Sequence, residues 1–318
     1  MTDDQMVTRA FIRALENHDV LGMKQIPKGD LHNHGSMGGS LSILEALTGI
    51  RLKKAYRKFN NIVEMQQWIT NHIYPMFGGK WGYETRTKAA FLQAKQDGIS
   101  VIKMSIDMSS INMYENSVQK LVDAIENIHI STAPDIQLIP EIGIDRGSPI
   151  STSIFMVEKF LKSDFFKSID LYGDELSQPI SRFKDIYKEA KDRGLLLNAH
   201  VGEFGDAESV REAVEILKLD HVQHGIAAAY SKDVMKWLAR NNIQLNICPA
   251  SNVMLNRVSD YHVHPIRLLY DNGIRVTINT DDVLVFGKGV SEEYFTSHDA
   301  GLFTPMELDE IRRSSLLT

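Results

Sequence analysis

The sequence predicts a (β/α)8 barrel, which is a closed parallel sheet surrounded by helices, formed by residues 1–318 as a single domain. Short apolar segments alternate with helical segments, eight strand-like segments can be counted, and polar side chains suited to catalysis follow several of these strands. An open, doubly wound sheet is the weaker alternative. The strands are expected at residues 28–34, 99–106, 136–143, 169–171, 195–200, 221–224, 243–247 and 274–279.

Helical segments surround the first strand. Apolar residues between Val7 and Leu15 suggest a short amphipathic helix, and a second helix is expected at residues 40–47, where a serine can cap its start. A basic, solvated connection follows at 51–58. Apolar residues at three-to-four spacing predict further helix over 59–77, mostly for core packing, although a few of its residues could line a hydrophobic lid over a pocket.

The remaining helices separate the later strands. Glycines after two of them, Gly98 and Gly194, are typical helix stops that lead directly into strands. These helices are expected at residues 89–96, 118–129, 154–161, 180–192, 207–217, 232–239, 266–270 and, after the last strand, 305–316.

Composition restricts the class of function. With a net charge of −6 and a pI near 6.0, and with dispersed Lys and Arg residues, the chain has no basic surface for nucleic acid, so a small-molecule ligand is expected. Residues 1–25 resemble neither a signal peptide nor a membrane span. Cys248 is the only cysteine, which excludes an internal disulfide and a CxxC zinc site and favours a cytoplasmic enzyme.

The candidate metal ligands are His32, His34, His200 and Asp281. His32 and His34 are two residues apart at the end of the first strand, so both side chains can point to one side. His200 and Asp281 follow the fifth and eighth strands, where the carboxyl ends of barrel strands meet. Three imidazoles and one carboxylate suit Zn²⁺, and also accept Fe, Co or Mn.

This set predicts hydrolytic chemistry. Zinc lowers the pKa of bound water to roughly 7, which would supply hydroxide as the nucleophile. His224 follows the sixth strand, where it could orient this water and accept its proton, and Asp281 could also hold the attacking oxygen. Glu203, three residues after His200, could protonate a ring nitrogen of the substrate as the adjacent carbon becomes tetrahedral.

The chain resembles adenosine deaminases and their relatives in the amidohydrolase superfamily. The motifs that carry this resemblance occur in the family's order along nearly the whole chain: PKGDLHNH at 27–34, DLYGDE at 170–175, HVGE at 200–203, HG at 224–225, CPASNV at 248–253 with HPI at 264–266, and TINTDD at 277–282. The resemblance implies a (β/α)8 barrel that holds zinc through the four ligands named above. Zinc deaminases of the cytidine type need a PCxxC signature, which one cysteine cannot supply.

The resemblance also implies roles for individual residues. Glu203 would protonate N1 of a purine, His224 would position the hydroxide that attacks C6, and Gly173 and Asp282 would contact N3 and N7. The expected reaction converts adenosine or 2′-deoxyadenosine into inosine or 2′-deoxyinosine and ammonia.

Two departures from the family pattern affect the expected substrate. Where family members that use adenosine have an Asp near the sugar, two residues after His34, this chain has Ser36 in a Gly- and Ser-rich loop. Such a loop can present backbone N–H groups to an anion, so an AMP-like or N6-methyl substrate is the alternative, and a metal-binding relative without turnover is a further one. The second departure lies in the second strand, where the family commonly has an acidic residue and an arginine near Lys103 and Ser105.

Overall fold

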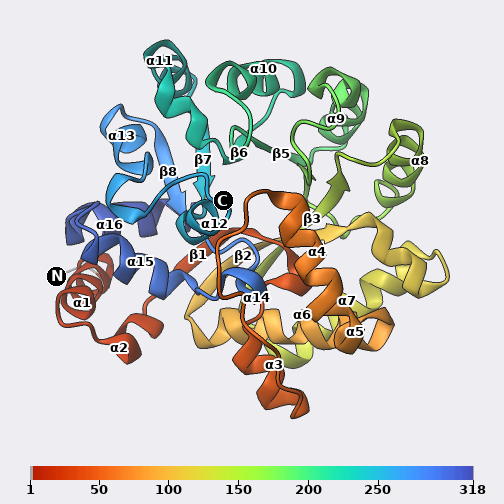
Figure 1. Ribbon diagram of the computed structural model, residues 1–318, viewed down its shortest axis with the longest axis horizontal. Helices are drawn as coiled ribbons and strands as arrows, with labels where there is room; N and C mark the ends of the chain where they lie inside the picture. Colours follow the sequence, from red (N-terminus) through yellow and green to blue (C-terminus); the bar gives the residue numbers. More distant parts are fainter. Residues whose placement is uncertain (1–2, 318) are drawn as a thin grey trace.

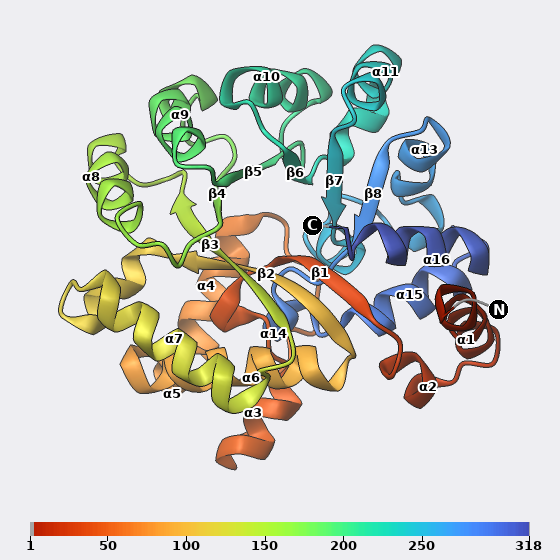
Figure 2. The same ribbon diagram turned by 180° about the vertical axis from the view of Figure 1, so that it is seen from behind.

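The computed structural model describes residues 3–317, and its centre is a sheet of eight parallel strands in sequence order, as Figure 1 and Figure 2 show from opposite sides. Each strand is hydrogen-bonded to the next one along the chain, as the alternation of strands and helices predicts. The strands are β1 (Lys28–Asn33), β2 (Ile99–Asp107), β3 (Gln137–Asp145), β4 (Ser168–Tyr172), β5 (Leu196–Val201), β6 (His221–His224), β7 (Gln244–Ile247) and β8 (Arg275–Ile278).

The last strand meets the first, so that the (β/α)8 barrel is nearly closed. Asn33 and Asp281 form an isolated parallel bridge, and the Asp281 N–H donates to the carbonyl of His32 at 2.9 Å. Side chains complete the seam, since the Asn279 Oδ1 accepts from the Leu31 N–H at 2.8 Å. The fold class predicted from the sequence is confirmed.

Helices surround the barrel and cover one of its ends. They are α1 (Asp3–Glu16), α2 (Val20–Lys24), η1 (Gly35–Met37), α3 (Leu41–Thr48), α4 (Ile62–His72), α5 (Tyr74–Phe77), α6 (Gly79–Gln96), η2 (Met108–Tyr114), α7 (Val118–Thr132), α8 (Ile150–Phe160), η3 (Ile180–Phe183), α9 (Lys184–Asp192), α10 (Ala207–Leu217), η4 (Ile226–Tyr230), α11 (Lys232–Arg240), α12 (Pro249–Met254), η5 (Tyr261–Val263), α13 (Ile266–Asp271), α14 (Val283–Phe286), α15 (Val290–Asp299) and α16 (Pro305–Ser314). No helix within residues 3–317 is both long enough and apolar enough to span a membrane.

Three predicted boundaries are wrong. Helix α6 begins at Gly79, ten residues before the predicted start at 89. Its buried residues include Gly82, Arg86 and Thr87 as well as apolar ones, so its sequence lacks the single apolar stripe that marks an amphipathic helix. The helix expected over 180–192 is divided into η3 and α9, and β1 ends at Asn33, so His34 lies just beyond it.

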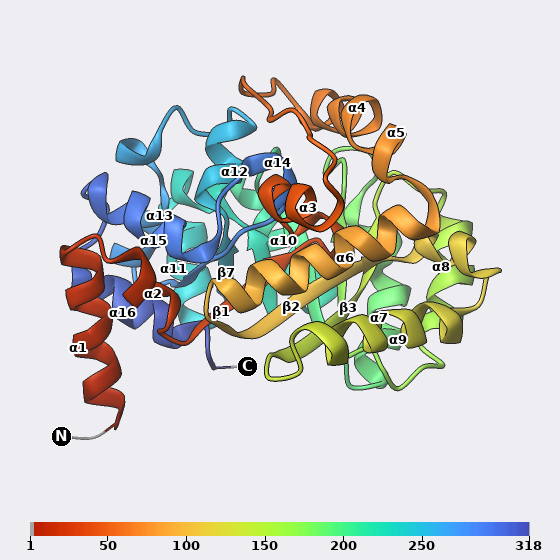
Figure 3. The same ribbon diagram turned by 90° about the horizontal axis from the view of Figure 1, so that it is seen from below.

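A cluster of apolar side chains, separate from the main core of the barrel, covers the end at which the strands finish. Met37 and Leu44 pack there with Ile69 and Phe77 from α4 and α5 and with Leu284 from α14. Figure 3 shows α4 and α5 at the same end of the molecule as α12 and α14. These apolar side chains pack together the helices that cover the carboxyl ends of the strands, where the candidate site is expected.

Candidate active site and metal centre

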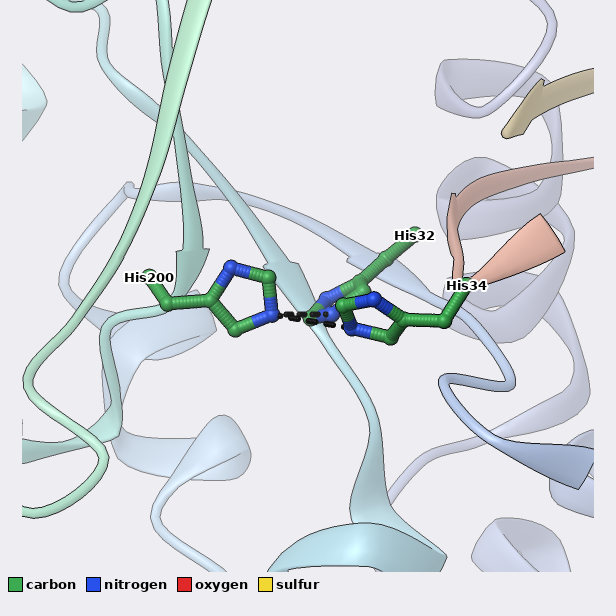
Figure 4. Close-up of side chains that lie close together, drawn as sticks. All are labelled: His32, His34 and His200. Atoms are coloured by element: carbon green, nitrogen blue, oxygen red, sulfur yellow. Dashed lines mark hydrogen bonds between the residues drawn. The ribbon is translucent and has the colours of Figure 1, made fainter. Parts of the chain in front are cut away.

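The structure brings the four predicted metal ligands together at the carboxyl end of the barrel. The Nε2 atom of His200 lies 2.9 Å from Nε2 of His32 and 3.1 Å from Nε2 of His34 (Figure 4). Asp281 Oδ1 lies 3.2 Å from His34 Nε2 and 4.0 Å from His32 Nε2. Ligand atoms bound tetrahedrally to zinc are separated by roughly 3.3 Å, so this set fits such an ion.

The charges of the site also suit a metal cation. Burial lowers the pKa of His32 and His200 to about 3, with neighbouring imidazoles adding to the shift, so both rings are neutral as ligands must be. Burial opposes ionisation of Asp281, but its hydrogen bond to His34 and the nearby imidazoles hold its pKa well below the usual range. The site therefore combines two neutral imidazoles with an ionised carboxylate. Burial opposes protonation of His34, but its hydrogen bond to Asp281 and the charge of Asp282 raise its pKa to about 10, so this ring must release a proton when it binds a metal.

A second group of side chains close enough to share an ion is His32, His224 and Cys248. Burial raises the pKa of the Cys248 thiol well above its usual value. A thiol must lose its proton to bind a metal, so the group that contains Cys248 is the poorer set of ligands. The set with three histidines and Asp281 is the better candidate.

Further side chains orient the ligands. Asp170 Oδ1 lies 3.1 Å from Nδ1 of His200, and the carbonyl of Asn246 lies 3.1 Å from Nδ1 of His32. These contacts leave both Nε2 atoms free to face an ion, as second partners of metal-binding histidines usually do. Ser105, one of the departures from the family pattern, donates to Oδ2 of Asp170 at 3.5 Å.

Replacing Asp170 by Asn is expected to weaken metal binding by about 10- to 100-fold, because His200 loses the carboxylate that orients it. Competition for zinc with a chromogenic chelator measures the affinity. Asp164→Asn, at an exposed position before β4, is the control and should bind metal normally. Equal affinity in the Asp170 variant would show that His200 needs no such partner.

Glu203 and His224 lie next to the metal ligands. Nε2 of His224 is 3.5 Å from Oε2 of Glu203 and 3.7 Å from Oδ2 of Asp281. Burial raises the pKa of Glu203 well above its usual value, and the charges of Asp281 and Glu175 add to this shift. Burial also lowers the pKa of His224 well below its usual value. The pair therefore consists of a protonated carboxyl group and a neutral imidazole.

Asn252 and His264 position this pair, and the sequence analysis assigned no role to either of them. The Asn252 amide donates to Oε1 of Glu203 at 2.9 Å and lies 3.2 Å from Nδ1 of His224. Nε2 of His264 lies 3.3 Å from Oδ1 of Asn252, which fixes the orientation of the amide. Both residues belong to motifs of the resemblance, which was the only signal for them in the sequence.

The loop that carries Glu203 is held by Glu175. Its carboxylate accepts hydrogen bonds from the backbone N–H groups of Glu203, Phe204 and Gly205 at 2.7–3.1 Å. A buried carboxylate that satisfies several N–H groups fixes the loop, so the Glu203 side chain leaves it in a defined direction.

Strained backbone conformations also occur at the candidate site. His224 and Asp281 have φ angles of 64° and 63°, in the left-handed region that non-glycine residues rarely adopt. Gly173 has a φ of 95°, and a Cβ there would meet Asp145 Oδ1 at 2.5 Å, so only glycine fits. Such strain persists only where the surrounding structure enforces it, and it commonly marks functional positions.

One cavity of about 480 Å³ connects these groups, a size typical of small-ligand sites. The predicted Gly173, Asp282 and Ser36 line it, together with Arg86 of α6, which the sequence analysis missed. Burial raises the pKa of Asp282 to about 7.

Lys103, in the second strand where the chain departs from the family pattern, lies within the barrel, where Nζ donates to Oδ1 of Asn198 at 3.2 Å.

Comparisons with known proteins agree with this geometry. The family model described as adenosine deaminase matches residues 90–317. A Treponema pallidum protein, provisionally named adenosine/adenine deaminase, is 34% identical over 285 residues, which cover 90% of this chain and 95% of that protein.

Solved structures with low sequence identity have the same fold. The adenine deaminase from Arthrobacter aurescens has a TM-score of 0.81 at 21% identity, covering 92% of this chain and 93% of that one. An amidohydrolase from Burkholderia ambifaria, solved with bound Zn, has a TM-score of 0.74 at 19% identity, covering 99% of this chain and 88% of that one. On the match to the family model and the similarity to the Treponema protein, the chain belongs to the adenosine deaminase family.

Proposed function

We propose that the protein removes the amino group from C6 of a 6-aminopurine by hydrolysis, with zinc as its metal. The observation that carries the proposal is the buried carboxyl group of Glu203, which lies beside His224 and the candidate metal ligands in one cavity and whose pKa is raised by burial. A protein that only binds a metal and a ligand needs neither a proton donor nor a proton acceptor at that position.

His32, His34, His200 and Asp281 would hold the metal, and their nitrogen and oxygen donors favour zinc. Bound zinc would make a water molecule acidic enough to act as a nucleophile near neutral pH. The remaining chemistry belongs to side chains of the protein.

Glu203 would donate its proton to N1 of the base as water adds to C6. His224 is neutral, so it would orient the water and accept its proton, while Asp281 would hold the attacking oxygen through Oδ2. His224 would then give its proton to the amino group, so that the C–N bond breaks and ammonia departs, and the hydroxyl on C6 would return a proton to Glu203 as it becomes the carbonyl of the product. Gly173 and Asp282, which line the same cavity, would contact N3 and N7 of the base.

The motifs of the resemblance favour adenosine and 2′-deoxyadenosine as substrates, which would make the protein a cytoplasmic adenosine deaminase. The names of similar proteins include both adenosine and adenine, so membership of the family leaves the substituent on the base open. A second candidate, an AMP-like or N6-methyl purine, is favoured by one observation: Ser36, in place of the expected Asp, accepts a hydrogen bond from Arg86 at 2.7 Å.

The testing experiment uses zinc-loaded protein and measures ammonia release from adenine, adenosine, 2′-deoxyadenosine and AMP, and methylamine release from N6-methyl-AMP. Turnover of any of these that is lost in Glu203→Gln supports the proposed function. Stoichiometric zinc without turnover of any of them would reject it and leave a metal-binding relative.

Replacing Ser36 by Asp is expected to raise kcat/KM for adenosine relative to AMP by about 10-fold. The new carboxylate would face the Arg86 guanidinium, neutralise it, and offer an acceptor to a 5′-hydroxyl group. Steady-state kinetics on both substrates gives the ratio, and Ser42→Asp, at an exposed position of α3, is the control. An unchanged ratio would remove residue 36 from the sugar side of the pocket.

A further inference from the structure

Arg86 is a buried cation in the wall of the substrate cavity. Its side chain extends from α6, the residue is 5% exposed, and it lines the same cavity as Glu203 and Asp281. Nη1 donates to the Ser36 Oγ at 2.7 Å and to its carbonyl at 3.3 Å, and Nε donates to the carbonyl of Phe77 at 3.3 Å. Arg86 is thereby fixed beside the residue that departs from the family pattern.

This guanidinium forms no ion pair with a described carboxylate, although Asp282 in the same cavity acts on its charge from beyond 4.0 Å. Within residues 3–317, no Asp or Glu oxygen lies within 4.0 Å of it, and Nη2 has no hydrogen-bond partner. Its surroundings are the carbonyls named above, the sulfur of Met37 at 3.2 Å and the ring of Tyr74, whose centroid is 5.4 Å away. Burying a charge without a counter-ion is costly, so such a position is best satisfied by a ligand of opposite charge.

The presence of Ser36 in place of the family's Asp also favours a negatively charged ligand. A hydroxyl group has one proton to donate, and the Ser36 oxygen already accepts from Arg86, so its O–H remains available to a ligand. An Asp at this position would accept a hydrogen bond from a sugar hydroxyl. Ser36 and Arg86 together offer an O–H and an N–H donor, which suits a ligand group made of acceptors.

We infer that Arg86 and Ser36 bind the phosphate of a purine nucleoside 5′-monophosphate, so that Arg86 is the specificity-determining residue of this pocket. A phosphate monoester carries a negative charge and several acceptor oxygens, and an arginine with an unused N–H group matches both. The inference rests on the proposed function, because the base must be bound by the catalytic residues for its 5′ substituent to reach Arg86.

The test compares kcat/KM for AMP and adenosine in the wild-type protein and in Arg86→Met, Arg86→Lys and Lys88→Met. The wild-type protein should favour AMP by at least about 10-fold. Arg86→Met should lower kcat/KM for AMP by about 100-fold and that for adenosine by less than about 3-fold. Arg86→Lys retains the charge, so it should lose less than Arg86→Met. Lys88→Met removes a charge from the exposed side of the same helix and should change neither value.

Two results would overturn the inference while leaving the proposed function intact: a wild-type preference for adenosine, or an equal loss on both substrates in Arg86→Met, which would mean that Arg86 only supports the loop. If the wild-type protein deaminates none of the purines, the proposed function fails instead. Calorimetric binding of IMP and inosine to zinc-loaded protein then decides the inference separately. Tighter binding of IMP that is lost in Arg86→Met supports it, and equal binding of the two rejects it.

Discussion

Glu203→Gln is expected to lower kcat by at least about 10³-fold, because an amide cannot supply the proton that N1 must receive. The environment of Glu203 explains the size of this effect. Its carboxyl group is buried, and its pKa lies well above the usual value, so the protonated form exists where the base enters. The substitution conserves shape, and Asn252 can still contact the side chain at position 203.

Steady-state kinetics on the preferred purine measures this effect, and two controls separate catalysis from folding. The variant should retain a full equivalent of zinc and bind the product, because Glu203 is not one of the metal ligands. Glu208→Gln makes the same change at an exposed position nearby on α10 and should keep full activity. Turnover within about 10-fold of wild type in Glu203→Gln would exclude the carboxyl group as the essential acid.

Removing the metal is expected to abolish turnover and also to lower the melting temperature. His32, His200 and Asp281 come from three different strand ends, so an ion that binds all of them stabilises the folded chain relative to the unfolded one. At a zinc concentration about 1,000 times the Kd, this stabilisation is about 4 kcal/mol.

Chelation followed by dialysis, with metal analysis, calorimetry and the ammonia assay before and after zinc is added back, measures both effects. His200→Ala should resemble the chelated protein in both measurements. His262→Ala, which removes an exposed histidine far from β5 in the sequence, should resemble the untreated protein. Full activity of a preparation shown to be free of metal would rule out the metal centre.

The barrel and the clustering of the candidate metal ligands could be predicted from the sequence because both depend on local patterns. The alternation of apolar strands and helices defines the barrel, and the carboxyl ends of parallel strands bring His200 and Asp281 towards His32 without any knowledge of packing. The second strand was found despite its polar Lys103, because the surrounding residues remain apolar.

Contacts between distant segments could not be predicted. Arg86 lies on a helix whose start was placed ten residues too late, and its importance depends on α6 packing beside η1, which no local pattern shows. Lys103 is similar: its partners Asn198 and His221 are on β5 and β6, across the barrel interior. The hydrogen-bond partners of Arg86 and Lys103 come from distant parts of the chain, so they are known only once the tertiary structure is known.

The seam between β1 and β8 links catalytic competence to the order in which the chain is made. Asp281 reaches its place by bridging to Asn33, so the segment with the first two histidines must wait until the last strand has been synthesised. Neighbouring strand–helix units can form early because their contacts join residues close in the sequence. Closure of the barrel joins its first and last strands, so it has the largest loss of chain entropy. The candidate metal site therefore gains its carboxylate only when the ring has closed.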